Sequence, residues 1–225
     1  MARTLIINAD DLGLSVGVNE GILDAHTRGV VTSASLMVDR AGAEHAAELT
    51  RKSPSLSVGL HFDDLAVDNL DDPDLAASAF MAQLERFREL TGQDPTHVDS
   101  HHHAHVENDR MAVFAGLVAP LGVPLRHDGR VRYLGGFYGQ PRRGVTDLSY
   151  VSPGFLLALI RSEVTEGFTE IGCHPARVDD FESSYLSERT VELTTLTESG
   201  LRDQIAAMGV KLASFHDWRP GSCTD

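Results

Sequence analysis

The chain has 225 residues, of which 42% are hydrophobic and 23% charged, as is ordinary for a soluble globular protein. This length suits one domain, so we expect residues 1–225 to fold as a single unit. The formal net charge of −14 argues against nucleic acid as a partner, because phosphate binding needs patches of lysine and arginine. No apolar run approaches the ~20 residues of a membrane span, and two cysteines make no disulfide framework. We therefore expect a cytoplasmic protein with no membrane span.

The first part of the chain alternates predicted strands with predicted helices. Short apolar, β-branched runs indicate buried strands, and apolar residues at helical spacing indicate helices between them. In chain order, we expect strands at 4–8, 31–38 and 57–62, a helix that begins near Ser15 or Asn19 and ends near Arg28, and helices at 41–51 and 74–91.

The stretch THVDSHHHAHVE, residues 96–107, holds five of the eleven histidines. Read as a strand, it places alternate residues on one face. That face would carry His97, Asp99, His101, His103 and His105. Carboxylate and imidazole together suit zinc, iron, nickel or manganese. The pattern predicts a metal site, and the alternative is a solvated loop whose histidines are incidental.

The second part of the chain continues the alternation. We expect helices at 109–121, 153–165 and 187–208, the last broken at Gly200, and strands at 122–126, 170–174 and 211–215. Residues 129–151 are the least regular stretch and mix glycines with aromatic residues such as Tyr138. This mixture suits a mobile loop that packs on a sugar ring, and an ordinary surface loop is the alternative.

Alternating strands and helices imply parallel strands joined by right-handed crossovers. About seven strands in one domain predict an α/β fold of the TIM-like (β/α) barrel type, irregular or incomplete, with a doubly wound open parallel sheet as the alternative. Both folds place sites at the C-terminal ends of strands. Four predicted strands deliver Asp or His side chains to that edge: Asp10, Asp11, His61, His101 and His174. Their convergence predicts a metal site, whereas no sequence motif supports a dinucleotide or a serine nucleophile.

Several segments, in this order, resemble the YdjC-like carbohydrate deacetylase family. They are LIINADDLGLSVGVNEGILDAHTRGVVTSASLMV at 5–38, SLSVGLHF at 55–62, THVDSHHHAH at 96–105, VPLR at 123–126 and EIGCHPA at 170–176. The resemblance implies a single YdjC-like deacetylase domain with a TIM-like barrel. It also implies a hydrolase that uses a divalent metal to remove the N-acetyl group from an amino sugar, such as a chitin-derived disaccharide.

The resemblance implies Asp11, His61 and His101 as ligands of one divalent metal ion, with zinc or magnesium the first choices. It implies Asp10 as the catalytic base that takes a proton as metal-activated water attacks the acetamide carbonyl. The leaving amine needs a proton, because amides hydrolyse poorly without one. His174 is our first candidate for this general acid.

The remaining candidate residues have less specific roles. His105 is the second candidate for the general acid, and His103 and Tyr138 are candidate substrate contacts. Arg126 either binds substrate or orients Asp10. On the strand interpretation, His102 should point away from the site and have no role.

The sequence departs from the family where substrate would lie. Phe62-Asp63-Asp64-Leu65 replaces a polar, threonine-containing stretch, the segment before the histidine strand is short, and the last fifty residues match poorly. One alternative is therefore a deacetylase of a lipid-linked, hopanoid-type amino sugar. Others are a metal-dependent hydrolase of a non-acetyl substrate and a binding protein without catalysis. The resemblance also suggests a homodimer.

Overall fold

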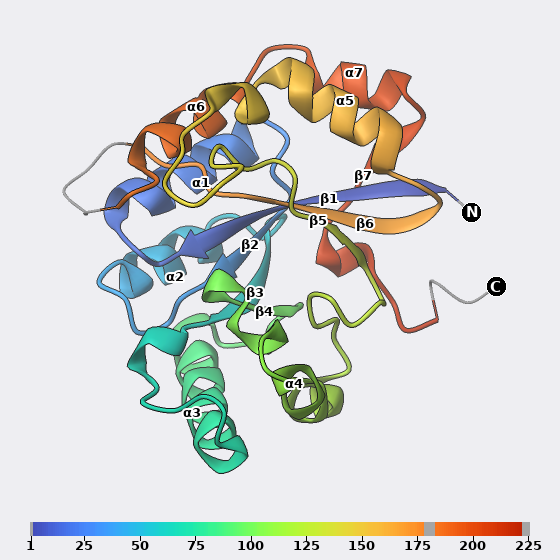
Figure 1. Ribbon diagram of the computed structural model, residues 1–225. Coiled ribbons are helices and arrows are strands. Elements are labelled where there is room, and N and C mark those ends of the chain that lie inside the picture. The colour runs from blue at the N-terminus through green and yellow to red at the C-terminus, as the bar shows by residue number, and fades with distance from the viewer. Residues whose placement is uncertain (1, 178–182, 222–225) are drawn as a thin grey trace.

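A central strand, β1 (Arg3–Leu12), organises the computed structural model, which describes residues 2–177 and 183–221 (Figure 1). Nine of its ten residues are buried, as the apolar run predicts. The sheet order is β4-β3-β2-β1-β6-β5, every pairing is parallel, and β7 pairs with the beginning of β1. The other strands are β2 (Ser33–Leu36), β3 (Ser57–Phe62), β4 (Val98–Ser100), β5 (Arg132–Leu134), β6 (Gly167–Cys173) and β7 (Val210–Leu212).

The sheet is part of a barrel and not a complete one. Within the described ranges no pairing joins its two edge strands, β4 and β5. The predicted α/β class, the parallel pairing and the count of seven strands are confirmed. Because the sheet stays open, the fold is intermediate between the incomplete barrel and the open sheet that the sequence suggested.

Seven helices among the described residues connect and cover the strands: α1 (Val16–Thr27), α2 (Ala43–Arg51), α3 (Pro73–Thr91), α4 (Arg110–Val118), α5 (Pro153–Glu163), α6 (Leu186–Leu196) and α7 (Leu201–Ala207). The Ser15 hydroxyl accepts from Val18 N and caps α1, as predicted. Gly92, at φ 74°, ends α3 in the left-handed conformation that favours glycine. None of the helices in residues 2–177 and 183–221 has the length and apolar character that a membrane span requires.

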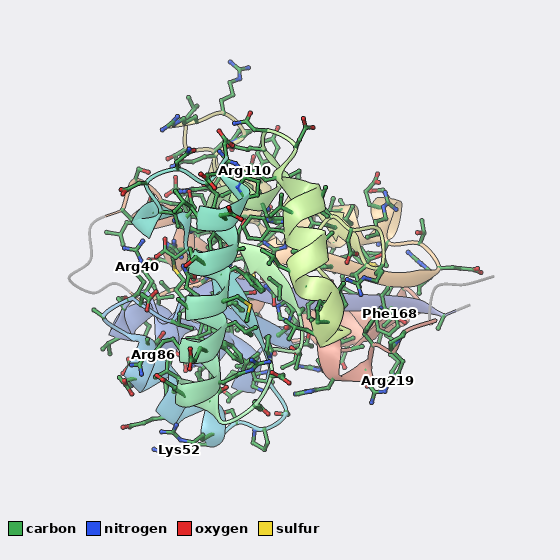
Figure 2. The ribbon with its side chains drawn as sticks, turned by 90° about the horizontal axis from the view of Figure 1, so that it is seen from below. Arg40, Lys52, Arg86, Arg110, Phe168 and Arg219 are labelled. Carbon is green, nitrogen blue, oxygen red and sulfur yellow. The ribbon has the colours of Figure 1, made fainter. Side chains whose placement is uncertain are left out.

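A cluster of three phenylalanines joins α3 and α4 to the sheet. The Phe62 ring from β3 lies 5.0 Å from Phe114 of α4 and 6.4 Å from Phe80 of α3, and all three are fully buried. Figure 2 shows α3 and α4 side by side over this face, with the charged Arg86 and Lys52 side chains at the periphery. This packing fixes β3 and therefore the position of His61, the next-to-last residue of that strand.

The turn and short strand predicted at 122–126 are reduced to a single parallel bridge. Leu125 pairs with Val98, with backbone hydrogen bonds from Val98 N to Pro124 O and from Arg126 N to Val98 O. Asp128 then accepts from Leu125 N, which turns the chain away. The strand that pairs with β6 on its outer side is β5, which lies inside residues 129–151, the stretch with the least regular sequence pattern.

The histidine stretch is extended only as far as Ser100. Residues His101–Val106 form 3₁₀ turns in which His102 and His103 have φ of 54° and 55°. The prediction that alternate histidines share one strand face is therefore wrong beyond Ser100, because left-handed residues break the two-residue periodicity.

Candidate metal centre and active site

Asp11, His61 and His101 come together where β1, β3 and β4 end. Asp11 Oδ1 lies 3.3 Å from His61 Nε2 and 3.1 Å from His101 Nδ1. One potential ligand atom from each residue lies within 4.8 Å of the others. The three residues predicted as a ligand set are thus side by side.

An irregularity in β1 brings two consecutive aspartates to this site. In a regular strand Asp10 and Asp11 would point to opposite faces. Here the pairing with β2 shifts register between Ala9 and Leu12, and Asp11 has φ of 68°, a left-handed conformation that Asp tolerates better than most residues. Both carboxylates therefore reach the same cavity.

The donor set fits a divalent metal ion. The buried His61 Nε2 has no hydrogen-bond partner among the described residues, while His61 Nδ1 lies 2.7 Å from Asp99 Oδ1. A carboxylate that holds the second nitrogen of an imidazole is the usual support of a metal-binding histidine. Arg189 donates to Asp11 Oδ2 at 2.5 Å, which leaves Oδ1 toward the two imidazoles. Two imidazoles and one carboxylate are a common donor set of hydrolytic zinc sites.

The charges around His61 favour a cation at this position. Burial alone would lower the pKa of His61, but the carboxylates of Asp99, Asp11 and Asp10 outweigh burial and raise it to about 10. Burial likewise opposes ionisation of Asp11, yet Arg189 holds the pKa of Asp11 well below its usual range. A positive charge is therefore stabilised here, and a metal would take the place of the His61 proton.

Arg126 holds Asp10 in place. Its guanidinium donates to both Asp10 oxygens, at 2.7 and 2.8 Å, and Asn8 donates to Oδ1 at 2.8 Å. Burial would raise the pKa of Asp10, but Arg126 overcomes this and lowers it. The Arg126 side chain is only 1% exposed and also lies 2.8 Å from Asp99 and 2.5 Å from Glu170. Asp10 is thus an ionised, oriented carboxylate, the state of a general base.

His174 faces Asp10 from the residue after β6. Its Nε2 lies 4.0 Å from Asp10 Oδ2, and its Nδ1 lies 4.0 Å from Glu192 Oε1. Burial lowers the pKa of His174 to about 4, against the carboxylates of Asp10 and Asp11. His174 lines the same cavity as the metal cluster, so the first candidate for the acid lies within the site.

The other histidines of the 96–107 stretch take different places. His105 is fully buried, and its ring nitrogens lie 2.6 Å from Ser100 Oγ and 2.9 Å from the Arg126 carbonyl oxygen. It stabilises the turn and is not among the residues that line the cavity, which favours His174 over His105 as the acid. His103 does line the cavity. The expectation that His102 points away is wrong, because it also lines the cavity and its ring centroid lies 3.8 Å from that of His101.

The cavity has a volume of about 560 Å³ and is lined by two chemically different groups of side chains. One group is the Asp and His side chains described above. The other group, which we call the aromatic wall, is Tyr133, Phe137, Tyr138 and Tyr185. The Tyr138 and Tyr185 rings stack at 4.3 Å with an interplanar angle of 4°, and Tyr138 is 37% exposed. Arg126 is not among the lining residues, which favours its orienting role over substrate binding.

Three charged residues near the site escaped the sequence analysis: Glu170, Arg189 and Glu192. Glu170 lies on β6, and the other two lie three residues apart on α6, so they share one face of that helix. All are buried. A charged residue at a position where a buried strand or helix stripe should be apolar was the available signal.

The fold and the site together define an α/β protein with a carboxylate and imidazole centre beside an aromatic-walled cavity. Comparisons with known proteins extend this. The family model described as "YdjC-like protein" matches residues 4–66 and 66–207. A chitooligosaccharide deacetylase of Klebsiella pneumoniae is 34% identical over 255 residues, which span 96% of this chain and all of the relative. The chain therefore belongs to the YdjC-like family of carbohydrate deacetylases, as its motifs predicted.

Solved structures agree on the fold. An Enterococcus faecalis protein, described as a candidate for cellobiose-phosphate cleavage, matches with a TM-score of 0.80 and 25% identity over 96% of this chain and 98% of its own. A family 4 carbohydrate esterase from Streptomyces lividans, solved with acetate, matches with a TM-score of 0.60 over 95% of this chain and 94% of its own. At 11% identity, the second match shows the fold alone.

Proposed function

We propose that the protein removes the N-acetyl group from an acetylated amino sugar of the chitooligosaccharide kind, in a reaction that requires one divalent metal ion. The observation that carries this proposal is the Asp11, His61 and His101 cluster beside the ionised Asp10. The 34% identity to a protein named chitooligosaccharide deacetylase supports the substrate class.

Asp11, His61 and His101 would hold the metal. Zinc and magnesium remain the first choices, and two imidazoles favour zinc, because magnesium prefers oxygen ligands in an octahedral arrangement. When bound, such a metal supplies Lewis-acid chemistry that acidifies water and polarises a carbonyl oxygen.

Asp10 takes the proton of the attacking water at its carboxylate. Arg126 keeps that carboxylate ionised and fixes both of its oxygens. His174 Nε2, 4.0 Å from Asp10, delivers a proton to the leaving amine nitrogen. The two groups thus serve opposite ends of one hydrolysis, a base for the nucleophile and an acid for the leaving group.

The aromatic wall supplies a surface for the sugar. The amine that leaves must lie near His174, and the Tyr138 ring centroid lies 5.5 Å from that of His174. Tyr138 is therefore placed to pack on the ring that carries the acetamide. His103 lines the same cavity, and its ring centroid lies 5.3 Å from that of Tyr133. We assign Tyr138 and His103 as substrate contacts.

The test is acetate release from N-acetylated mono- and oligosaccharides by metal-stripped protein, with and without added zinc, magnesium, manganese, cobalt or nickel. We expect release only after a metal is restored. Protein that binds metal but releases no acetate from any of these sugars would contradict the proposal. The lipid-linked amino sugar and the non-acetyl substrates would then be tested next.

A further inference from the structure

Helix α6 places the buried carboxyl group of Glu192 next to His174, on the Nδ1 side of its ring. Glu192 is 0% exposed, and its Oε1 lies 4.0 Å from His174 Nδ1. Its Oε2 accepts a hydrogen bond from the backbone N–H of His174, and its Oε1 accepts one from the Tyr185 hydroxyl at 2.5 Å. One carboxyl group therefore fixes the backbone of His174 and also faces its ring.

The ring of His174 lies between two carboxyl groups. Nε2 faces Asp10 in the cavity, and Nδ1, on the other side, faces Glu192 at the same 4.0 Å. Nδ1 is buried and has no hydrogen-bond partner among the described residues. A buried imidazole nitrogen without a polar partner is unfavourable. Among the described residues, Glu192 is the carboxyl group that lies 4.0 Å from this nitrogen.

We propose that Glu192 is a positioning residue that pairs with Nδ1 of His174, so that the pair retains the proton which Nε2 delivers to the leaving amine. This inference rests on the proposed deacetylation for one point only, which is that the group accepting the proton is the leaving amine. In the step itself the Nε2–H bond breaks and an N–H bond forms on the amine, while the carbon–nitrogen electron pair leaves with nitrogen. His174 keeps its Nδ1–H toward the ionised Glu192, and solvent returns the proton before the next turnover.

The charges around the pair agree with a shared proton. Burial raises the pKa of Glu192 to about 8, despite the His174 backbone N–H, the Tyr185 hydroxyl and Arg189. Burial lowers the pKa of His174 to about 4, and Arg189 and His61 act in the same direction. Asp10 and Asp11 of β1 favour the charged ring. A proton that is bound at a pH between these two pKa values belongs to the pair of His174 and Glu192 and not to either residue alone.

The other titratable groups near the pair are uncharged. Burial raises the pKa of Tyr138, of Tyr185 and of the Cys173 thiol, so these groups stay neutral at physiological pH. Within residues 2–177 and 183–221, Glu192 is therefore the carboxyl group that faces Nδ1 of His174.

The same helix offers a matched control. Glu188 is 1% exposed, lies one turn before Glu192, and accepts hydrogen bonds from Thr146 Oγ1 at 2.5 Å and Gln140 Nε2 at 2.9 Å. It holds the 129–151 loop through these two residues, and its carboxylate is not bonded to His174. Glu188→Gln removes a buried carboxylate from α6 without touching the pair.

The deciding measurement is the ¹⁵N NMR titration of His174 in zinc-loaded protein, assigned by comparison with His174→Asn. We expect the wild-type ring to lose its proton above the ordinary pKa of ~6.5 for histidine, and Glu192→Gln to lower the midpoint by about one pH unit or more. Glu188→Gln should leave it unchanged. A wild-type midpoint near 4, or the same midpoint in wild type and Glu192→Gln, would overturn the pairing.

Kinetics give the second readout. The alkaline limb of the pH profile for kcat/KM of acetate release should move to lower pH in Glu192→Gln, with a loss of about 10²-fold at pH 8 and no change in KM or zinc affinity. Glu192→Asp, which keeps the charge, should restore part of the rate. An alkaline limb that stays in place contradicts the pairing. If no sugar releases acetate while the NMR midpoint shifts as expected, the proposed function fails and the pairing stands.

Discussion

The Asp99 carboxylate lies 2.7 Å from Nδ1 of His61, on the side of the ring opposite Asp11. It also accepts from the Ser35 hydroxyl at 2.6 Å and pairs with Arg126 at 2.8 Å. Asp99 thus fixes which nitrogen of His61 is free to bind a cation. Since Arg126 also holds Asp10, one buried network positions both the candidate metal ligand and the candidate base.

This network predicts that Asp99→Asn weakens metal binding without removing a ligand. An amide keeps an acceptor for His61 but loses the charge that orients the ring, so we expect zinc affinity to fall about 10- to 100-fold. Isothermal titration with zinc measures the effect. Asp128→Asn is the control. Asp128 accepts hydrogen bonds from Leu125 N and Arg130 Nε, and it therefore stabilises a turn and does not contact His61. Equal zinc affinity in Asp99→Asn and wild type would show that Asp99 has no such role.

The two adjacent aspartates should separate metal binding from proton transfer. Asp10→Asn should lower kcat about 10²- to 10⁴-fold and leave one metal bound, because it removes only the base. Asp11→Asn should lose the metal itself. Both variants are tested by measuring their metal content with inductively coupled plasma emission spectroscopy and their rate of acetate release. Full activity in Asp10→Asn would show that the base lies elsewhere.

Tyr138 should affect substrate binding more than chemistry. Tyr138→Ala removes the exposed partner of the stacked Tyr138 and Tyr185 pair, and we expect KM to rise about tenfold, which corresponds to ~1.4 kcal/mol of lost packing. Tyr138→Phe keeps the ring and should keep KM. Tyr150→Ala, outside the cavity lining, controls for loss of an aromatic residue from the same loop. A fall in kcat alone would contradict a binding role.

His97 should make the protein sensitive to acid. Its ring stacks on Phe215 at 3.8 Å, and burial, the largest cause, lowers its pKa to about 3. The folded protein keeps His97 neutral, whereas the unfolded chain takes up a proton below pH ~6.5. The unfolded state therefore binds more protons between pH 3 and 6.5, and stability falls as pH falls through this window.

The size of this effect can be measured by urea unfolding. Between pH 7.5 and 5.5, His97 should contribute a loss of about 1.4 kcal/mol in the free energy of unfolding. The glutamine in His97→Gln cannot be protonated. The free energy of unfolding of this variant should therefore fall by about 1.4 kcal/mol less than that of wild type between pH 7.5 and 5.5, whatever its stability at pH 7.5. The same pH dependence in both proteins would mean that His97 takes up its proton in the folded state.

The sequence by itself determined the α/β class, the parallel pairing and the family. Apolar runs such as residues 4–8 must be buried on both faces, and helices between such strands force parallel crossovers. Asp11, His61 and His101 could be placed at one edge for the same reason, because the C-terminal ends of parallel strands meet there. Local pattern is enough for such conclusions, since each follows from a few neighbouring residues.

Only the tertiary structure decided how the histidine stretch is used. The sequence offered several imidazoles at strand spacing, but the chain turns after Ser100, and His105 is bound on both ring nitrogens inside the fold. The missed strand β5 and the open edge of the sheet are also consequences of long-range pairing, which no local window contains.

The contacts of the charged residues around the site could be predicted from the sequence least of all. Arg126 reaches Asp10 across 116 positions of the chain, and Arg189 reaches Asp11 across 178. A charge within the buried stripe of a helix marks Arg189 and Glu192 as unusual, but the sequence does not tell which residues they contact. Their role arises because a buried charge is stable only beside a partner, and the folded chain alone determines which partners meet.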